Sequence, residues 1–332
     1  MNTTTTDGTT DGTTDAAMGT TAGTTAEARD GTTDATTGAM AEARDAATDA
    51  ATDAETVQGV RRWWDADGGW STADSTGTVL VIDSWLVDEG RVRGLDRHAA
   101  RFAAACDRFR GPGAERTDRF LRAVAEASPA RGRWFPRVEL VETGSGTRLR
   151  MWPRPAPPRT ATVRLWTAPG PDRRRLPAVK GVDLDHLASL RAAATGAGAD
   201  EALLVSAEGH VVEGATTSVV WWRGDTLCGP PPGPGLLPGI TRALLGELAA
   251  AAGHQVVTER ATPQDLADLP VWTLNALHGI RPVTEGLGRF RGADTAATEL
   301  WQSRLTALAV PADAAPLPPA YPRRRFPDDR GT

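Results

Sequence analysis

The first 56 residues contain no valine, leucine, isoleucine or aromatic residue, and this absence confines any packed core to the rest of the chain. Segment 1–57 repeats Thr, Asp, Gly and Ala, and its eight Asp, three Glu and two Arg give it a net charge of −9. Such a stretch cannot bury enough apolar surface to offset the entropy lost on ordering. We therefore predict a disordered low-complexity tail over 1–57. Because the whole chain carries −5, the remainder carries about +4.

The other end of the chain is also distinct in composition. Residues 311–332 are rich in Pro and Arg and show no apolar period, which predicts an irregular tail. Between the two tails the pattern alternates short strands and helices, which predicts an α+β fold in two parts. We expect a small α+β domain over 58–165 and a larger one over 166–310. A ligand cleft is expected between them, because clefts between domains commonly hold ligands.

Apolar periodicity places the individual elements. In the small part it predicts a bent strand or two short strands at 78–87, helices starting at Asp96 and covering 117–127, and a hairpin over 133–152 turned at 144–146. In the large part it predicts helices over about 183–195, from about Gly239 and over about 294–308, with strands at 160–166, 201–206, 211–214, 217–222, 254–260 and 271–275.

The overall charge and composition exclude several classes of protein. The net charge of −5 and pI of about 5.6 argue against a nucleic-acid binder, which would show a basic patch. No apolar run approaches the length of a membrane span, and the first residues show no secretory signal. The two cysteines, Cys106 and Cys228, cannot build a disulfide framework or a cysteine-based zinc site. We expect a cytoplasmic protein with no metal centre.

One lysine stands out. Lys180 is the only lysine beside 36 arginines, as expected if a bias in the sequence replaces lysine wherever a positive charge suffices. An arginine cannot replace an amine that must lose its proton and attack a carbonyl, because the guanidinium stays charged. Chance survival of this lysine and a chemical role are both compatible with composition alone.

Three further features suggest the ligand of such an amine. Glu213 ends a mostly apolar strand, where its carboxylate is either solvated or paired with a buried positive group such as a pyridinium nitrogen. Pro238 suits the first turn of a helix, and the N–H groups of Ile240 and Thr241 would then form an anion site. Arg101, on the first predicted helix, could hold a phosphate with its two-pronged guanidinium. An amine, an acid and a phosphate site together describe pyridoxal phosphate.

Three segments carry a resemblance to a known family: "ADEALLVSAEGHVVEGATTSVVWW", "GLLPGITRALLGELA" and "LNALHGIRPV". In this order they resemble the class IV aminotransferases, the fold-type IV pyridoxal-phosphate enzymes, which include branched-chain and D-amino-acid aminotransferases and aminodeoxychorismate lyase. The resemblance covers about 80–310 and is strongest from Lys180 onward. It implies a two-domain fold with the cofactor in the cleft, pyridoxal 5'-phosphate as cofactor, an amino acid or oxo acid as substrate, and a homodimer.

The resemblance also implies individual roles. Lys180 matches the lysine that binds the cofactor covalently, and Glu213 matches the glutamate that pairs with the pyridine nitrogen. The phosphate would be held by Arg101 and by the main-chain N–H groups of Ile240 and Thr241. Thr217 would offer its hydroxyl to the cofactor.

The sequence departs from the family pattern on the substrate side. The stretch before the first long helix lacks the family's acidic and glycine-rich motif. Ser84 stands where the family places a small hydroxyl residue. Asp185 stands where transaminases of the family often have a tyrosine. Asn275 and Ala276 occupy the loop that often carries a phosphate-binding threonine, and this loop looks more like the lyase branch. We treat Ser84, Asn275 and Ala276 as candidate substrate contacts.

Three functions therefore stay open. The first is an aminotransferase that acts on a small amino acid and a 2-oxo acid. The second is an aminodeoxychorismate lyase that releases pyruvate and 4-aminobenzoate, and the third is a catalytically degenerate protein that binds the cofactor. One lysine would serve either enzyme, so Lys180 does not decide between them.

Overall fold

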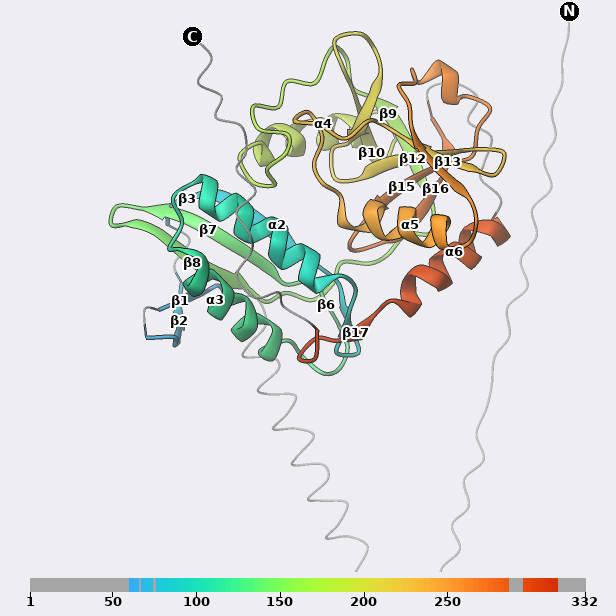
Figure 1. Cartoon of the computed structure of the whole chain (residues 1–332). Helices are drawn as coiled ribbons and strands as arrows, with labels where there is room; N and C mark the ends of the chain where they lie inside the picture. The colour runs from blue at the N-terminus through green and yellow to red at the C-terminus, as the bar shows by residue number, and fades with distance from the viewer. Residues whose placement is uncertain (1–59, 66, 74–75, 287–294, 316–332) are drawn as a thin grey trace, which may run out of the picture. The chain divides into compact units, whose positions relative to one another are not determined.

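The computed structural model describes residues 60–65, 67–73, 76–286 and 295–315 (Figure 1). The predicted tail over 1–57 lies outside the described residues, as does the C-terminal segment from residue 316. Among the described residues, five helices and several sheets give the α+β fold that the sequence predicts.

The N-terminal part is built on an antiparallel five-stranded sheet in the order β2-β1-β8-β7-β3. Two helices pack on this sheet, and their apolar stripes join its inner face in one core around Phe102, Phe120 and Leu140 (Figure 1). The elements are β1 (Arg62–Trp64), β2 (Trp70–Thr72), β3 (Thr78–Ser84), β7 (Arg137–Thr143), β8 (Gly146–Trp152), α2 (Leu95–Arg108) and α3 (Ala114–Glu126).

A second, small sheet connects the chain's C-terminal segment to this part. Its strands are β4 (Val87–Asp88), β5 (Arg91–Val92), β6 (Arg133–Trp134) and β17 (Val310–Pro311), in the order β17-β5-β4-β6. Pro311 pairs with Arg91, and the next residue, Ala312, is buried in the core. The first residues of the predicted C-terminal tail are therefore packed against the protein.

The larger sheet has eight strands in the order β11-β10-β9-β16-β15-β12-β13-β14. The pairs β9–β10, β9–β16 and β13–β14 are parallel, and the others are antiparallel. The strands are β9 (Val163–Thr167), β10 (Glu201–Val205), β11 (Val211–Gly214), β12 (Ser218–Arg223), β13 (Thr226–Gly229), β14 (Gln255–Thr258), β15 (Val271–Asn275) and β16 (Gly279–Glu285).

Successive side chains of β12 point to opposite faces of this sheet, and each face has its own hydrophobic core. Trp222 packs with residues of α5 (Ile240–Ala251) and α6 (Thr295–Ala307), whereas its neighbour Trp221 packs with Leu266 and Val271 on the other face. The third helix of this part, α4 (Leu184–Gly196), packs on β9 and β10 (Figure 1).

The predicted elements agree with the structure at most positions. The stretch 78–87 is two strands, β3 and β4, and the hairpin is β7 and β8 with its turn at 144–145. The predicted strand start at residue 133 belongs instead to β6, which pairs with β4. The domain boundary at 165 stays a prediction, and this residue lies inside β9.

Strands β1, β2, β5, β13, β16 and β17 were not predicted. β16 contains Pro282, which argues against a central strand because proline lacks an N–H donor. In the structure Pro282 precedes Val283, the first residue of β16 that pairs with β9, so the missing donor falls outside that ladder. β1 and β2 have three residues each, too few to show a period.

Candidate active site

A cavity of about 710 Å³ is lined by all nine residues to which the sequence analysis assigned a cofactor or substrate role. This volume lies within the usual range of small-molecule sites. The nine residues come from β3, α2, the loop before α4, the β11–β12 region, the start of α5 and the β15–β16 turn. They are Ser84, Arg101, Lys180, Glu213, Thr217, Ile240, Thr241, Asn275 and Ala276.

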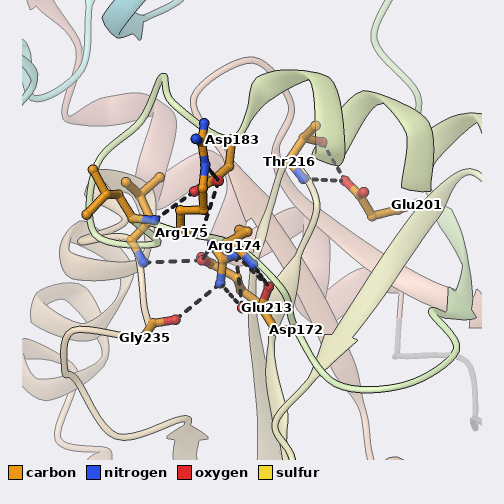
Figure 2. Close-up of polar contacts among 10 residues, drawn as sticks. Asp172, Arg174, Arg175, Asp183, Glu201, Glu213, Thr216 and Gly235 are labelled. Carbon is orange, nitrogen blue, oxygen red and sulfur yellow. Dashed lines mark hydrogen bonds and ion pairs between the residues drawn. The ribbon is translucent and has the colours of Figure 1, made fainter.

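The loop that carries Lys180 is fixed at both ends. The carbonyl of Lys180 accepts a hydrogen bond from the Ile82 N–H of β3 at 2.7 Å. On the other side the buried carboxylate of Asp183 accepts the main-chain N–H groups of Arg175 and Leu176, both at 2.9 Å (Figure 2). These contacts hold the lysine's backbone in place without using its amine.

Glycine is required next to the lysine. Gly181 has φ 154°, and a Cβ added there would lie 2.3 Å from the carbonyl oxygen of Leu80. The Lys180 loop therefore approaches β3 more closely than any side chain at position 181 would allow.

The surroundings of Lys180 lower the pKa of its amine. Burial and the nearby Arg101 guanidinium lower the pKa of Lys180, while the carboxylates of Asp83 and Glu213 oppose this shift. An amine with a lowered pKa is a better nucleophile and proton acceptor near neutral pH than an ordinary lysine.

Glu213 is buried and has a protein partner, Arg174. The hydrogen bonds that Glu213 accepts from described residues both fall on Oε1, one from Arg174 Nη1 and one from the Leu237 N–H at 3.2 Å (Figure 2). Oε2 therefore keeps its acceptor capacity. Arg174 is itself held by Asp172, whose Oδ2 accepts from Nη2 at 2.7 Å, and by the carbonyl of Gly235 at 3.1 Å.

Arg174 opposes protonation of the glutamate. Burial raises the pKa of Glu213, and the Arg174 charge, its hydrogen bond and the Leu237 N–H act in the opposite direction. Burial also opposes the charge on Arg174, but the hydrogen bonds with Asp172 and the attraction of Glu213 outweigh it and raise the pKa of Arg174. The ion pair and these hydrogen bonds therefore favour the charged carboxylate and act against burial, which is the largest effect and raises the pKa of Glu213.

Arg101 is oriented by a buried carboxylate at the end of β3. Asp83 accepts from Arg101 Nε at 2.9 Å and Nη2 at 2.8 Å, and it also contacts His98 Nδ1 at 2.8 Å. Although burial raises the pKa of Asp83, the charges and hydrogen bonds of Arg101 and His98 outweigh it and hold that pKa far below its usual range. Burial in turn lowers the pKa of His98, against the attraction of Asp83.

The same arginine reaches the start of α5. Arg101 Nη1 donates to the carbonyl of Pro238 at 2.9 Å, one residue before Gly239, which precedes the helix. The first N–H groups of a helix have no partner within it and lie at its positive end. Arg101 and the N–H groups of Ile240 and Thr241 therefore lie together at this end of the cavity, and groups of this kind can bind an anion. A Cβ at Gly239 would lie 2.3 Å from Ser218 Oγ, so the Ser218 hydroxyl would have to move to accommodate a side chain there.

Thr217 provides a test of whether a cofactor fits. Its Oγ1 is buried and has no hydrogen-bond partner among the described residues, although Thr217 lines the cavity. An unsatisfied buried hydroxyl is costly unless a ligand completes it. Together with the amine, the carboxylate and the anion site, this hydroxyl fits pyridoxal phosphate.

The three candidate substrate contacts differ in how they are used. Ser84 Oγ lies 3.5 Å from Arg154 Nη2 and lines the cavity. The side chain of Asn275 closes the β15–β16 turn, because its Oδ1 accepts from the His278 N–H at 2.8 Å. The carbonyl of Ala276 accepts from Arg93 Nη2 at 3.3 Å.

Sequence reasoning missed the residues that support the site. Two of them had a detectable signal: Asp83 is a charged residue within an apolar strand, and Asp183 lies three residues after the lysine that the sequence singles out. Arg174 had none, because it is one of three consecutive arginines and only the fold shows which of them turns inward. Arg137 and Arg154 also line the cavity without having been foreseen.

Neither a metal centre nor a membrane span appears in the described part of the chain. No cluster of three or more His, Cys, Asp or Glu side chains there could hold a metal ion. None of the helices described is long and apolar enough to cross a membrane.

Comparison with solved structures supports the fold. A fold IV-transaminase from Curtobacterium pusillum superposes with a TM-score of 0.61 at 19% identity, over 75% of this chain and 97% of the other. A branched-chain amino acid aminotransferase from T.th. superposes with a TM-score of 0.65 at 20% identity, over 76% and 94%. A hypothetical aminotransferase from Mycobacterium tuberculosis in its PLP-bound form gives 0.62 at 22% identity, over 75% and 98%. The predicted fold-type IV architecture is thereby confirmed.

Sequence comparison adds the family. A Methanocaldococcus jannaschii protein described as "Putative branched-chain-amino-acid aminotransferase" is 37% identical over 90 residues, which is 27% of this chain and 31% of that protein. The chain thus matches about a third of the length of that relative. The family described as Amino-transferase class IV matches residues 80–285, more than half of the chain. The chain therefore belongs to the class IV aminotransferases, a family of enzymes that use pyridoxal 5'-phosphate.

Proposed function

We propose that the protein is an aminotransferase that moves an amino group between a small amino acid and a 2-oxo acid, with pyridoxal phosphate in the cavity around Lys180. The observation that carries this proposal is the meeting of three groups at one cavity. These are a half-buried amine, a glutamate held by Arg174, and an anion site made by Arg101 and the start of α5.

These residues would contact different parts of the cofactor. Lys180 would bind it covalently, Glu213 would pair with the ring nitrogen, and Thr217 would use its free hydroxyl. Arg101 and the N–H groups of Ile240 and Thr241 would hold the phosphate. When bound, the cofactor withdraws electrons from the carbon that carries the amino group, which makes the proton on that carbon acidic.

The chain's own groups supply the rest of the chemistry. Because its pKa is lowered, the Lys180 amine can accept the proton from the substrate's α-carbon and return it elsewhere. The Arg174 guanidinium favours the charged form of Glu213, and a charged carboxylate would favour a proton on the ring nitrogen. Asp83 holds Arg101 in one orientation, which fixes the phosphate end relative to the lysine.

Lyase activity is the second candidate, and one local feature favours it. The β15–β16 turn reads Asn275-Ala276-Leu277, which resembles the lyase branch, and Asp185 replaces the tyrosine often found in transaminases. A degenerate cofactor-binding protein is the third candidate. Its weakness is that the amine, the acid and the phosphate site are all present at one cavity.

The decisive experiment combines labelling with a substrate screen. Protein loaded with pyridoxal phosphate is reduced with borohydride, and mass spectrometry is expected to find the label on Lys180. The loaded protein is then given amino acids with 2-oxo acids, and separately aminodeoxychorismate. New amino acid and oxo acid support transamination, whereas pyruvate with 4-aminobenzoate supports the lyase. Labelling without either product supports the degenerate binder, and a label elsewhere contradicts the site.

Family resemblance also leads us to infer a homodimer that works in the cytoplasm. Light scattering of the full chain tests the dimer. A mass of one 35.0 kDa subunit in solution would contradict it.

A further inference from the structure

The turn that carries Thr217 lies between two strands that belong to different parts of the large sheet. Residues 215–217 connect β11 to β12 and belong to neither strand. β11 pairs with β10, whereas β12 pairs with β15. Glu213, which precedes the turn, and Thr217, which ends it, both line the cavity around Lys180. The position of this turn therefore decides where two cavity groups lie relative to each other.

The first two residues of β10 hold the turn. Oε2 of Glu201 accepts from the Thr216 N–H, at 3.3 Å, and from the Thr216 hydroxyl (Figure 2). Oε1 of the same carboxylate accepts from the Ala202 N–H at 3.1 Å. The Ala202 carbonyl in turn accepts from the Ala215 N–H at 2.9 Å. Two successive residues of the turn are thus fixed to β10, Ala215 through the main chain and Thr216 through a side chain.

Glu201 is costly to bury, and Thr216 is its main partner. The residue is 1% exposed and forms no ion pair within 4 Å in the described part of the chain. Burial, the largest effect, raises the pKa of Glu201, and the Thr216 hydrogen bond is the largest of the effects that lower it. A buried polar group that loses its partner is destabilised by the cost of its desolvation. The carboxylate and the turn therefore hold each other in place.

The constraint reaches Thr217 through the backbone of the turn. The Thr217 carbonyl accepts from the Gly214 N–H at 2.7 Å, which closes the turn around Thr216. A Cβ at Gly214 would lie 2.2 Å from Thr217 Oγ1 and 3.1 Å from Glu201 Cγ, so the hydroxyl and the glutamate side chain meet over Gly214. That hydroxyl is buried and has no hydrogen-bond partner among the described residues. Its direction is therefore set by the turn.

Glu201 itself lies behind the cavity wall. Thr216 and Thr217 line the cavity, whereas Glu201 does not, so it can act on a ligand there only through the turn. We propose that Glu201 is a positioning residue, whose hydrogen bonds to Thr216 hold the turn so that the Thr217 hydroxyl is aimed at the bound cofactor. The inference rests on the proposed function for the identity of the cofactor, but it concerns cofactor binding, which is measured without turnover.

The test is a double-mutant cycle on cofactor binding. Pyridoxal phosphate is titrated into the apo forms of the wild type, Thr216→Val, Thr217→Val and the double variant, and the affinity and the absorbance of the bound cofactor are measured. Each single variant is expected to weaken binding about two- to tenfold, the effect of one neutral hydrogen bond. Because both changes act on the same contact, the double variant should bind no more weakly than Thr217→Val. Thr216→Ser keeps the hydroxyl and should bind like the wild type.

Glu201→Gln extends the cycle to the carboxylate. In the amide one of the two oxygens becomes an NH2 group, which repels either the Thr216 or the Ala202 donors, so the turn should loosen. We expect its cofactor affinity to fall when Thr217 is present and to change no further in a Thr217→Val background. Urea denaturation checks that each variant is folded, and if Glu201→Gln does not fold, Thr216→Val and Thr216→Ser decide the test.

Thr262→Val is the matched control. Thr262 donates its N–H and its hydroxyl to one oxygen of Asp265, both at 2.8 Å, as Thr216 does to Glu201, but this pair is exposed and outside the cavity. The control should bind the cofactor like the wild type.

Additive losses in the double variant would show that Thr216 acts independently of Thr217, and they would overturn the proposal. Unchanged affinity in either single variant, or an equal loss in the control, would overturn it too. A wild type that binds no pyridoxal phosphate would contradict both this inference and the proposed function. A protein that shows the expected cycle but transfers no amino group would contradict the proposed function alone.

Discussion

Arg174 donates from Nη1 to Oε1 of Glu213, and its Nε and Nη2 are held by Asp172 (Figure 2). The glutamate therefore has a fixed positive partner on one oxygen, and the other oxygen keeps its acceptor capacity. Such an arrangement favours the charged carboxylate, against the effect of burial, through a partner that belongs to the protein itself. It thus separates the electrostatic role of Glu213 from its contact with the cofactor.

Replacing Glu213 with glutamine tests that role. We expect Glu213→Gln to retain cofactor binding but to lose most of its turnover, because a neutral amide cannot favour a protonated ring nitrogen. The lost charge-assisted hydrogen bond corresponds to about 1.5–3 kcal/mol. Steady-state rates and the absorbance of the bound cofactor are the measurements. The control is Glu208→Gln, since Glu208 is exposed and contacts only Ser206 among described side chains. Near-normal rates in Glu213→Gln would contradict the assignment.

The close approach of the lysine loop to β3 yields a second prediction. Gly181→Ala would bring a Cβ to 2.3 Å from the Leu80 carbonyl, so the loop must move away from the strand. We expect it to destabilise the protein by about 1–3 kcal/mol through overpacking, in addition to about 1 kcal/mol for its backbone conformation. Covalent cofactor attachment should slow, because Lys180 moves with the loop.

Gly170→Ala is the control for Gly181→Ala. Gly170 also has a positive φ, 76°, but a Cβ there would meet nothing within 4 Å. Gly170→Ala should lower the unfolding free energy, measured by urea denaturation, only by the cost of its backbone conformation. It should attach the cofactor at the normal rate. Equal losses of stability in the two variants would show that the contact with β3 does not matter.

The Asp83–Arg101 pair leads to a third prediction. In Asp83→Asn the Arg101 guanidinium loses its charged bidentate partner, so we expect a lower affinity for pyridoxal phosphate. We also expect the unfolding free energy to fall by about 3–5 kcal/mol, as is typical when one partner of a buried ion pair is removed. The affinity is measured by equilibrium titration of the apo protein. Glu247→Gln breaks the exposed ion pair between Glu247 of α5 and Arg97, which lies on the same helix as Arg101, and should change both quantities little. An unchanged affinity in Asp83→Asn would argue that Arg101 is positioned by other contacts.

Some site residues could be identified from the sequence and others could not, and the difference has physical reasons. Lys180 and Glu213 are identified because their chemistry cannot be replaced and because the motif spacing in this half of the chain is specific. Arg174 could not be identified, because the chain has 36 arginines and its role depends on which carboxylates the fold places beside it. For the same reason Asn275 could be placed at the cavity, but its part in closing a turn appeared only with the backbone.

The elements of the fold also divide into those that the sequence predicts and those that it does not. Long apolar strands such as β3 and β12 and amphipathic helices such as α2 carry enough periodic residues to be predicted. Two- and three-residue strands such as β1 and β17 exist because partner strands from distant parts of the chain supply their hydrogen bonds. No local pattern encodes such a pairing.

The last prediction concerns acid pH and His278. Its Nδ1 accepts from the Thr160 N–H at 3.2 Å, so the ring must be neutral to make this bond. Burial, followed by the charges of Arg281, Arg159 and Arg191, lowers the pKa of His278 from 6.5 to about 4. Between these values the unfolded chain binds the proton and the folded protein does not, so this residue's contribution to stability is complete above pH 6.5 and is lost as the pH falls through about 4.

His278→Asn removes the titration but keeps an oxygen that can accept from Thr160. We expect the variant's unfolding free energy to fall less steeply than that of the wild type between pH 6.5 and 4, as measured by urea denaturation at several pH values. His210→Gln serves as the control, because the His210 ring makes no hydrogen bond in the described part of the chain. Parallel curves for the wild type and His278→Asn would mean that His278 does not titrate differently in the folded protein.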